Sequence, residues 1–168
     1  GWTQAGDETI GASLFAVYTQ GAATLKIQAP LPAANLSVSQ SSGTEAEESQ
    51  ITVTVTTVIP VIGDQFVDVT VTGTGINASD YTITDADNVT AGIQIRIPDG
   101  QTSGSVTFTV TDDALYEDNE TATLTILNAS AGIVLGTIQS RIITITDNDP
   151  LPLVSFTTTS TDVSESAG

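Results

Sequence analysis

Apolar and polar residues alternate along most of this chain, and that period of two limits its fold more than any other feature. Ile51, Val53 and Val55, for example, are separated by threonines. Successive side chains of a β-strand point to opposite faces of a sheet, so each such segment has one apolar and one hydroxyl-rich face. The pattern predicts strands at residues 36–39, 51–55, 66–71, 93–97, 106–110, 124–126 and 143–145. No segment shows a helical period.

Turn residues separate these strands, among them Gly63-Asp64 and Pro98-Asp99-Gly100. Short strands at this spacing predict an all-β fold, an antiparallel two-sheet immunoglobulin-like β-sandwich. The chain has 168 residues, enough for one such domain and additional segments.

The charge balance is strongly acidic, with 20 Asp and Glu residues against three Lys and Arg and a net charge of −17. Such a field repels phosphate backbones and anionic lipids, so we expect no nucleic-acid partner. No apolar run is long enough to span a bilayer, so we also expect no membrane insertion. Cations are the natural partners of this chain.

Cys, His and Met are absent. The chain therefore has no disulfide, no thiolate nucleophile and no histidine base, and we expect that it is not an enzyme. Because an initiator Met is also missing, we expect a processed or excised piece of a longer protein.

An internal repeat appears at an offset of 118 residues. Leu36-Ser37-Val38 matches Val154-Ser155-Phe156, and Leu25 and Ile27 match Ile143 and Ile145. Chance similarity among threonine-rich strands is the alternative explanation. We interpret 1–35 as the end of a preceding module or a donor-strand segment, 36–150 as one whole β-sandwich, and 151–168 as a linker and the first strand of a following repeat.

The end segments also suggest an assembly. Residues 14–28 and 154–158 have strand character, and we hypothesise that they add to a sheet edge of this chain or of a neighbouring copy. Neighbouring modules of the same protein, or copies of it joined by strand addition, are therefore the expected protein partners.

Two acidic clusters lie where strands end. Thr111 to Glu120 carries Asp112, Asp113, Glu117 and Glu120, and a second cluster reads Asp147-Asn148-Asp149-Pro150. Carboxylates gathered at one end of a sandwich repel one another unless a cation lies between them. Hard oxygen ligands on irregular loops suit Ca²⁺ better than Mg²⁺.

These residues resemble the Calx-beta domain family, tandem calcium-binding β-sandwich modules of extracellular proteins, over about residues 36–150. The resemblance rests on Glu47, Ala78-Ser79-Asp80-Tyr81, Pro98-Asp99-Gly100-Gln101, Asp112-Asp113 through Glu117 and Glu120, and Ile145-Thr146-Asp147-Asn148-Asp149. It implies a seven-stranded sandwich with Ca²⁺ held by loop carboxylates at one end.

The metal ligands implied by the resemblance come from four loops. They are Glu47 after the first strand, Asp80 at the end of the third, Asp112, Asp113, Glu117 and Glu120 in one long loop, and Asp147 and Asp149 at the end of the module. Glu48 is an alternative to Glu47 at the first position.

We expect a calcium-binding structural or adhesive module of a secreted or cell-surface repeat protein. This expectation includes a filament subunit whose copies are joined by β-strand addition. The alternatives are a calcium-sensing or ligand-binding module and a noncatalytic accessory domain of a secreted hydrolase. Five asparagines lie in Asn-x-Ser/Thr triplets and are candidate glycan acceptors: Asn35, Asn77, Asn88, Asn119 and Asn128.

Overall fold

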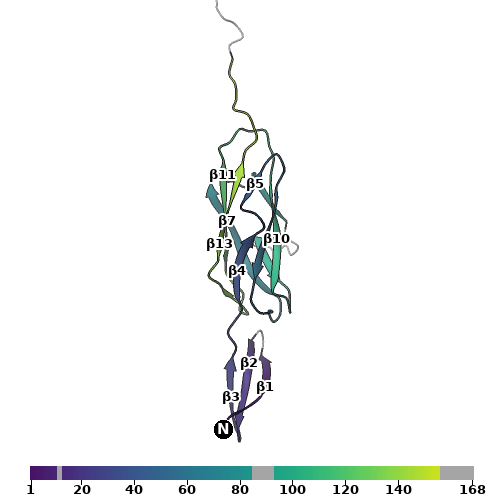
Figure 1. Ribbon diagram of the computed structural model, residues 1–168, viewed down its shortest axis with the longest axis vertical. Helices are drawn as coiled ribbons and strands as arrows, with labels where there is room; N and C mark the ends of the chain where they lie inside the picture. Colours follow the sequence, from purple (N-terminus) through teal and green to yellow (C-terminus); the bar gives the residue numbers. More distant parts are fainter. Residues whose placement is uncertain (11–12, 85–92, 156–168) are drawn as a thin grey trace, which may run out of the picture.

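The computed structural model describes residues 1–10, 13–84 and 93–155, which form a small three-stranded sheet and a two-sheet sandwich (Figure 1). The small sheet has the order β1 (Thr3–Ile10), β2 (Ser13–Gln20) and β3 (Ala23–Gln28). The sandwich strands are β4 (Ala33–Val38), β5 (Ser42–Thr44), β6 (Gln50–Thr56), β7 (Gln65–Thr74), β8 (Tyr81–Thr84), β9 (Ile93–Ile97), β10 (Ser103–Val110), β11 (Glu120–Leu127), β12 (Val134–Leu135) and β13 (Ser140–Thr146).

The sandwich consists of two five-stranded sheets, in the orders β12-β4-β6-β10-β8 and β5-β13-β11-β7-β9. Most neighbouring strands are antiparallel, whereas β12 pairs with β4, and β5 with β13, in parallel. The all-β sandwich expected from the sequence is confirmed. Six of the seven expected strands lie wholly within observed strands, and the expected strand 36–39 extends one residue past the end of β4. The short strands β5, β8 and β12 are absent from the sequence prediction.

Alternating burial accounts for the core. Ile51, Val53 and Val55 of β6 are fully buried, while Thr52 and Thr56 between and beside them are exposed. Across the sheet, β10 sits in register with β6, so apolar residues oppose apolar residues and Thr opposes Thr. Each such fully buried Val or Ile contributes about 1.5–3 kcal/mol through removal of apolar surface from water.

One aromatic pair anchors the core near the start of β8. The rings of Tyr81 and Phe108 stack with centroids 4.9 Å apart and an interplanar angle of 12°. Phe108 is fully buried, and Tyr81 is paired in register with Val110 at the end of β10. The stack therefore fixes β8 against β10 immediately beside the acidic Asp80.

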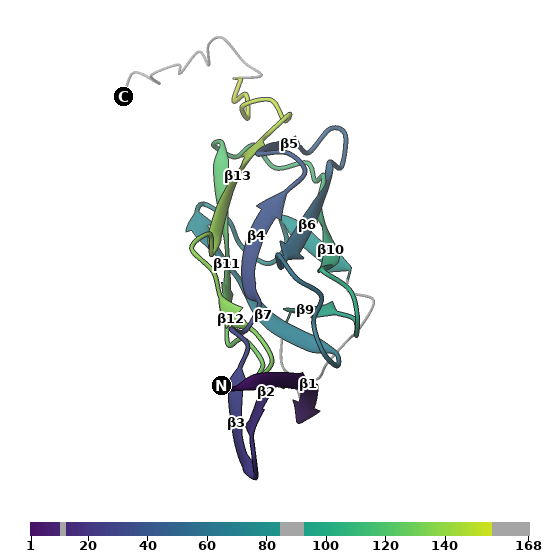
Figure 2. The ribbon, with the colours of Figure 1, turned by 60° about the horizontal axis from the view of Figure 1, so that its bottom comes forward.

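The connectivity brings four loops to one end of the sandwich. β10 and β13 run toward this end, and β8 and β11 begin there, because β8 and β11 are antiparallel to them. The β5–β6 turn lies at the same end, whereas the small sheet lies at the opposite end (Figures 1 and 2). We call the first of these the acidic end and the second the base.

The N-terminal strands differ from one expectation. The sequence predicts that 14–28 adds to a sheet edge of the sandwich or of a neighbouring copy; in this chain β2 instead lies between β1 and β3 and pairs with both. These strands form their ladder hydrogen bonds within a separate sheet, and they pair with no described strand of the sandwich. The proposed strand 154–158 extends beyond the described residues, and Val154 and Ser155 lie outside any strand.

The described residues include no helix, and so none with the length and apolar character to cross a bilayer.

Candidate metal centre

Glu45 is held at the acidic end by a tight turn between β5 and β6. Its amide donates a hydrogen bond to Thr146 O (3.2 Å) at the end of β13, and its carbonyl accepts one from Glu48 N (2.7 Å). Glu48 adopts φ 44°, a left-handed conformation that closes the turn. Ser49 Oγ accepts a hydrogen bond from Thr44 N at 2.9 Å. These contacts leave Glu45 only 2% exposed, with its carboxylate facing the end of β13.

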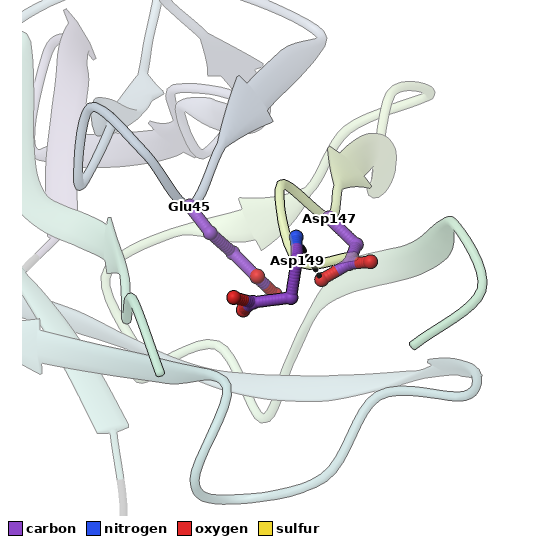
Figure 3. A group of neighbouring side chains, drawn as sticks. All are labelled: Glu45, Asp147 and Asp149. Atoms are coloured by element: carbon purple, nitrogen blue, oxygen red, sulfur yellow. Dashed lines mark hydrogen bonds between the residues drawn. The ribbon is translucent and has the colours of Figure 1, made fainter. Parts of the chain in front are cut away.

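Glu45, Asp147 and Asp149 form the first carboxylate group, in which one oxygen from each lies within 4.8 Å of the others (Figure 3). Asp147 follows β13 directly, and Asp149 N donates a hydrogen bond to Asp147 Oδ1 at 3.2 Å. The turn made by this hydrogen bond brings both aspartates to the same side of the chain, opposite Glu45.

Asp80, Glu117 and Glu120 form the second group, again with oxygens within 4.8 Å of one another. Asp80 precedes β8, where its carboxylate accepts a hydrogen bond from Asn77 N, and its carbonyl accepts one from Thr111 N at 2.9 Å. Asp80 therefore lies just before a strand, and not at the end of one as the resemblance implied.

A glycine makes room for the second group. Gly75 has φ 80°, and a Cβ atom added there would lie 2.9 Å from Glu120 Oε1. Glu120 is the first residue of β11 and is 4% exposed. The absence of a side chain at Gly75 thus allows this carboxylate to occupy a buried position under the loop.

Burial and mutual repulsion raise the pKa values of the most enclosed carboxylates. Burial is the main cause at Glu45 and Glu120, and it raises the pKa of each from 4.5 to about 7. The negative charge of Asp147 adds to the shift at Glu45, and that of Asp80 adds to the shift at Glu120. Burial followed by the charges of neighbouring acids also raises the pKa values of Glu117 and Asp149.

Three buried oxygen atoms of the two groups lack hydrogen-bond partners in the described part of the protein. Among the described residues, four buried side-chain oxygens accept or donate no hydrogen bond, and three belong to the groups: Glu45 Oε2, Glu120 Oε2 and Asp149 Oδ2. A buried ionised carboxylate without a partner is costly. The residues therefore fit a bound cation, which would supply the missing partner to each oxygen.

No basic side chain provides that charge. Lys26 pairs with Glu8 (2.6 Å) in the small sheet, and Arg96 with Asp64 (2.9 Å) near the base. Arg141 lies near the start of β13, away from the acidic end, and donates to Ser140 O. The donor set around both groups consists of oxygen alone, which selects hard cations over thiophilic or imidazole-binding metals.

The structure brings five of the eight expected ligands into the two groups: Asp80, Glu117, Glu120, Asp147 and Asp149. Asp112 and Asp113 are exposed beside them. Asp112 Oδ1 accepts a hydrogen bond from Asn148 Nδ2 (3.2 Å), and Asp113 Oδ1 accepts one from Leu115 N (2.7 Å).

Glu47, the ligand that the resemblance implies in this turn, is exposed and lies outside both groups. Glu45, which is not among the expected ligands, belongs to the first group. Three acids lie within four residues in this turn, and the positive φ of Glu48 that fixes the shape of the turn is visible only in the structure.

The acidic end is also open to solvent. A hollow there is lined by Tyr116, Glu117, Asp118, Asn119, Asp147, Asn148 and Asp149. It borders one member of the second group and two of the first, so an ion could reach either group without rearrangement of the sandwich.

Fold and site together define a β-sandwich with two carboxylate groups at one end, each of which could hold a metal ion. No protein-family description matches the sequence. No curated protein matches it either.

Solved structures do match the fold. The chain is similar to the apo-form Calx CBD1 domain, with a TM-score of 0.52 and 18% identity over 71% of this chain and 100% of that one. It is also similar to the calcium binding domain CBD12 of CALX1.1 (TM-score 0.51, 19% identity) and to CBD12 from CALX1.2 (TM-score 0.50, 20% identity). Each of these two matches covers 64% of this chain and 41% of the other. The resemblance to the Calx-beta sandwich is confirmed for the fold.

Proposed function

We propose that this chain is a calcium-binding structural module of a secreted or cell-surface repeat protein. The observation that carries the proposal is the pair of carboxylate groups, in which three buried oxygens have no hydrogen-bond partner and beside which the described structure places no basic side chain. Similarity to structures described as calcium-binding domains supports the same choice of ion. Ca²⁺ accepts six to eight oxygens in irregular geometry, which suits groups assembled from separate loops.

Calcium would act here as a cross-link. In the first group it would join the β5–β6 turn, through Glu45, to the chain leaving β13, through Asp147 and Asp149. In the second it would join the turn before β8 to the β10–β11 loop. The protein has no disulfide, so these ions would provide its main constraints on the loops of the acidic end.

The proposed role is mechanical and noncatalytic. The exit from the acidic end reads Asp149-Pro150-Leu151-Pro152, where a metal ligand is followed by two prolines with restricted φ. A bound ion would therefore stiffen the point at which this sandwich joins whatever follows. Such stiffening suits a spacer or adhesive unit in a repeat protein.

Thermal unfolding and calorimetric titration test the proposal. With Ca²⁺ we expect a higher melting temperature than with a chelator, and a smaller gain with Mg²⁺. Glu45→Gln and Glu120→Gln should each reduce the calcium-dependent gain. Glu47→Gln is the matched control, because it removes the same charge from an exposed residue outside both groups. An equal gain in all three variants, or none in the parent, contradicts the proposal.

Surface glycans would accompany secretion in a host that attaches them. Asn77, Asn119 and Asn128 are exposed and Asn35 is half-buried, but Nδ2, the atom that would carry the glycan, donates to Asp68 Oδ2 in Asn128 (2.9 Å) and to Ala33 O in Asn35 (3.5 Å). We infer that Asn77 and Asn119 are the accessible acceptors among the described triplets; Asn88 lies outside the described residues. Mass spectrometry of native material tests this, and modification at Asn35 or Asn128 alone would contradict it.

Strand addition between copies is a second mode of assembly. Leu25 (46%) and Ile27 (50%) of β3 are exposed, as is Trp2 (47%) before β1, and Leu25 and Ile27 match the fully buried Ile143 and Ile145 in the repeat. Because β3 is an edge strand of the small sheet, a strand of another copy could pair with it. Light scattering coupled to size-exclusion chromatography should then show association that Ile27→Lys abolishes. A parent that stays monomeric at high concentration rules it out.

A further inference from the structure

The tripeptide Pro-Leu-Pro occurs twice in the chain, at 30–32 and 150–152, separated by 120 residues. The first copy joins β3 to β4, and the second follows β13 and the first carboxylate group. Each copy therefore leaves the end of one sheet unit and precedes a segment that resembles the first strand of a sandwich. The two copies differ in what surrounds them.

The first copy is docked on the base of the sandwich that follows it. Residues 30–32 line a small apolar pocket together with Ile59, Pro60 and Ile62 from the β6–β7 connection. Pro32 O accepts a hydrogen bond from Val134 N at 3.0 Å, which continues into the parallel pairing of β12 with β4. The linker is thus held by apolar packing and by a backbone hydrogen bond.

The second copy has no such cover in the described structure. Leu151 is 69% exposed, whereas the matching Leu31 is partly buried. Val154 is 87% exposed, whereas Leu36, its match in the 118-residue repeat, is 1% exposed. The apolar side chains in and after the second tripeptide are therefore exposed to solvent, whereas their matches at the first junction are packed against the sandwich.

We propose that Pro150-Leu151-Pro152 is a docking segment for the base of a second sandwich of this type. Leu151 would lie against the second sandwich's own counterparts of Ile59, Pro60 and Ile62 and line an apolar pocket with them, as Leu31 does in this chain. The inference rests on the proposed function as one module of a repeat protein. The partner is a sandwich that follows in the same polypeptide, because in a separate copy Val134 N already donates its hydrogen bond to Pro32 O and Leu31 already lines the pocket.

The two junctions differ in their relation to the carboxylates. Ile27 and Ile145 match at an offset of 118, but the tripeptides match at 120, so the second junction has two additional residues. Four residues, Thr146 to Asp149, separate Ile145 from the second tripeptide, whereas only Gln28 and Ala29 separate Ile27 from the first. Three of the four belong to the acidic segment Asp147-Asn148-Asp149. An ion bound at the first carboxylate group would therefore constrain the second junction and not the first.

A chain with residues 33–152 duplicated in tandem tests the docking. This chain keeps every residue of the parent and places Ala33 of the second sandwich directly after Pro152. Hydrogen exchange at the second sandwich's Val134 amide is the readout, since docking gives that amide Pro152 O as its acceptor. With Ca²⁺ present, we expect its protection to equal that of the first Val134 amide within about threefold.

Leu151→Ser in the first sandwich of the duplicated chain should lower protection of the second Val134 amide at least tenfold and leave the first unchanged. Leu31→Ser is the matched control and should have the opposite pattern. In the parent chain Leu151→Ser should change neither exchange nor melting temperature, because the side chain is exposed there. Unchanged protection of the second amide in the duplicated Leu151→Ser chain overturns the docking.

The metal dependence has its own readout in the same chain. A chelator should lower protection of the second Val134 amide and leave the first unchanged, and equal behaviour of the two amides overturns the dependence on the ion. A titration of the duplicated chain with Ca²⁺ separates this inference from the proposed function. If Leu151→Ser lowers protection but calcium does not bind, the docking is supported and the calcium role is contradicted. If calcium binds but Leu151→Ser has no effect, the calcium role is supported and the docking is contradicted.

Discussion

Replacing Glu120 with Gln should stabilise the metal-free protein above pH 7, although it removes a proposed metal ligand. Glu120 is 4% exposed, and its Oε2 has no hydrogen-bond partner among the described residues. Burial, followed by the charges of Asp80 and Glu117, raises the pKa of Glu120 to about 7. Above that pH the folded protein carries a buried and uncompensated charge, which the neutral amide of Gln lacks.

The sign of the pH dependence follows from this raised pKa. The folded protein binds the Glu120 proton more tightly than the unfolded chain does, so the contribution to stability is complete below 4.5 and is lost as pH rises through about 7. The advantage of the Gln variant should therefore be small near pH 4.5, grow up to about pH 7, and stay constant above it.

The magnitude can be bounded. A pKa that moves from 4.5 to about 7, at about 1.4 kcal/mol for each tenfold change in proton affinity, sets an upper limit of about 3 kcal/mol. The loops of the acidic end can relax and admit water, so we expect about 1–2 kcal/mol. For a chain of this length, that corresponds to a rise in melting temperature of roughly 2–8 °C.

Scanning calorimetry in chelator between pH 4.5 and 8 measures the effect, with Glu47→Gln as the control for loss of an exposed charge. Calcium should reverse the order of stability. At a concentration 100 times the dissociation constant, one bound ion stabilises the parent by about 2.7 kcal/mol, and the variant should gain less because it has lost a carboxylate. A Glu120→Gln protein that is less stable than the parent in chelator at pH 8 would refute the reasoning.

Three further predictions follow from the same contacts. Calcium binding at pH 6.5 should release protons, because the pKa of Glu45 is raised to about 7 and the ion requires the ionised carboxylate; titrations in two buffers of different ionisation enthalpy measure this, and no release at pH 6.5 contradicts it. Gly75→Ala should weaken calcium binding in calorimetric titration, since its Cβ would lie 2.9 Å from Glu120 Oε1; Gly100→Ala, at a similar positive φ with no neighbour within 4 Å, should lose about 1 kcal/mol of stability without losing affinity. Phe108→Ala should cost about 3–5 kcal/mol in denaturant unfolding, because it empties a fully buried site and removes the stack on Tyr81; a loss below about 1 kcal/mol would show that the site collapses.

Local sequence information was sufficient for the sheets. The alternation of Val and Ile with Thr is a property of neighbouring residues, and it places β6 and β10 in the core with one apolar face each. The same pattern could not identify β12, which has only two residues, or β5, which has three. Their pairing is parallel and joins segments far apart in the chain, so it depends on the assembled sandwich.

The candidate metal centre was predictable in part for a similar reason. Acids that follow one strand lie at the same end of the sandwich as acids at the start of its antiparallel neighbour, and Asp80, Glu120 and Asp147 meet this condition. Which acid of the β5–β6 turn joins them is not a property of the local sequence.

Sequence alone determined the fold class and the positions of the longer strands, because side-chain direction in a strand follows from its place in a period of two. It also determined that negative charge gathers at one end, because the acidic segments connect these strands. The tertiary structure alone decided that Glu45 and not Glu47 meets Asp147, through a turn with Glu48 at φ 44° and a hydrogen bond from Glu45 N to Thr146 O. Only two positions separate Glu45 from Glu47 in that turn, yet Glu45 is buried and Glu47 is exposed. The hydrogen bond that fixes Glu45 is made to the end of β13, about a hundred residues further along the chain, so the local sequence does not contain this information.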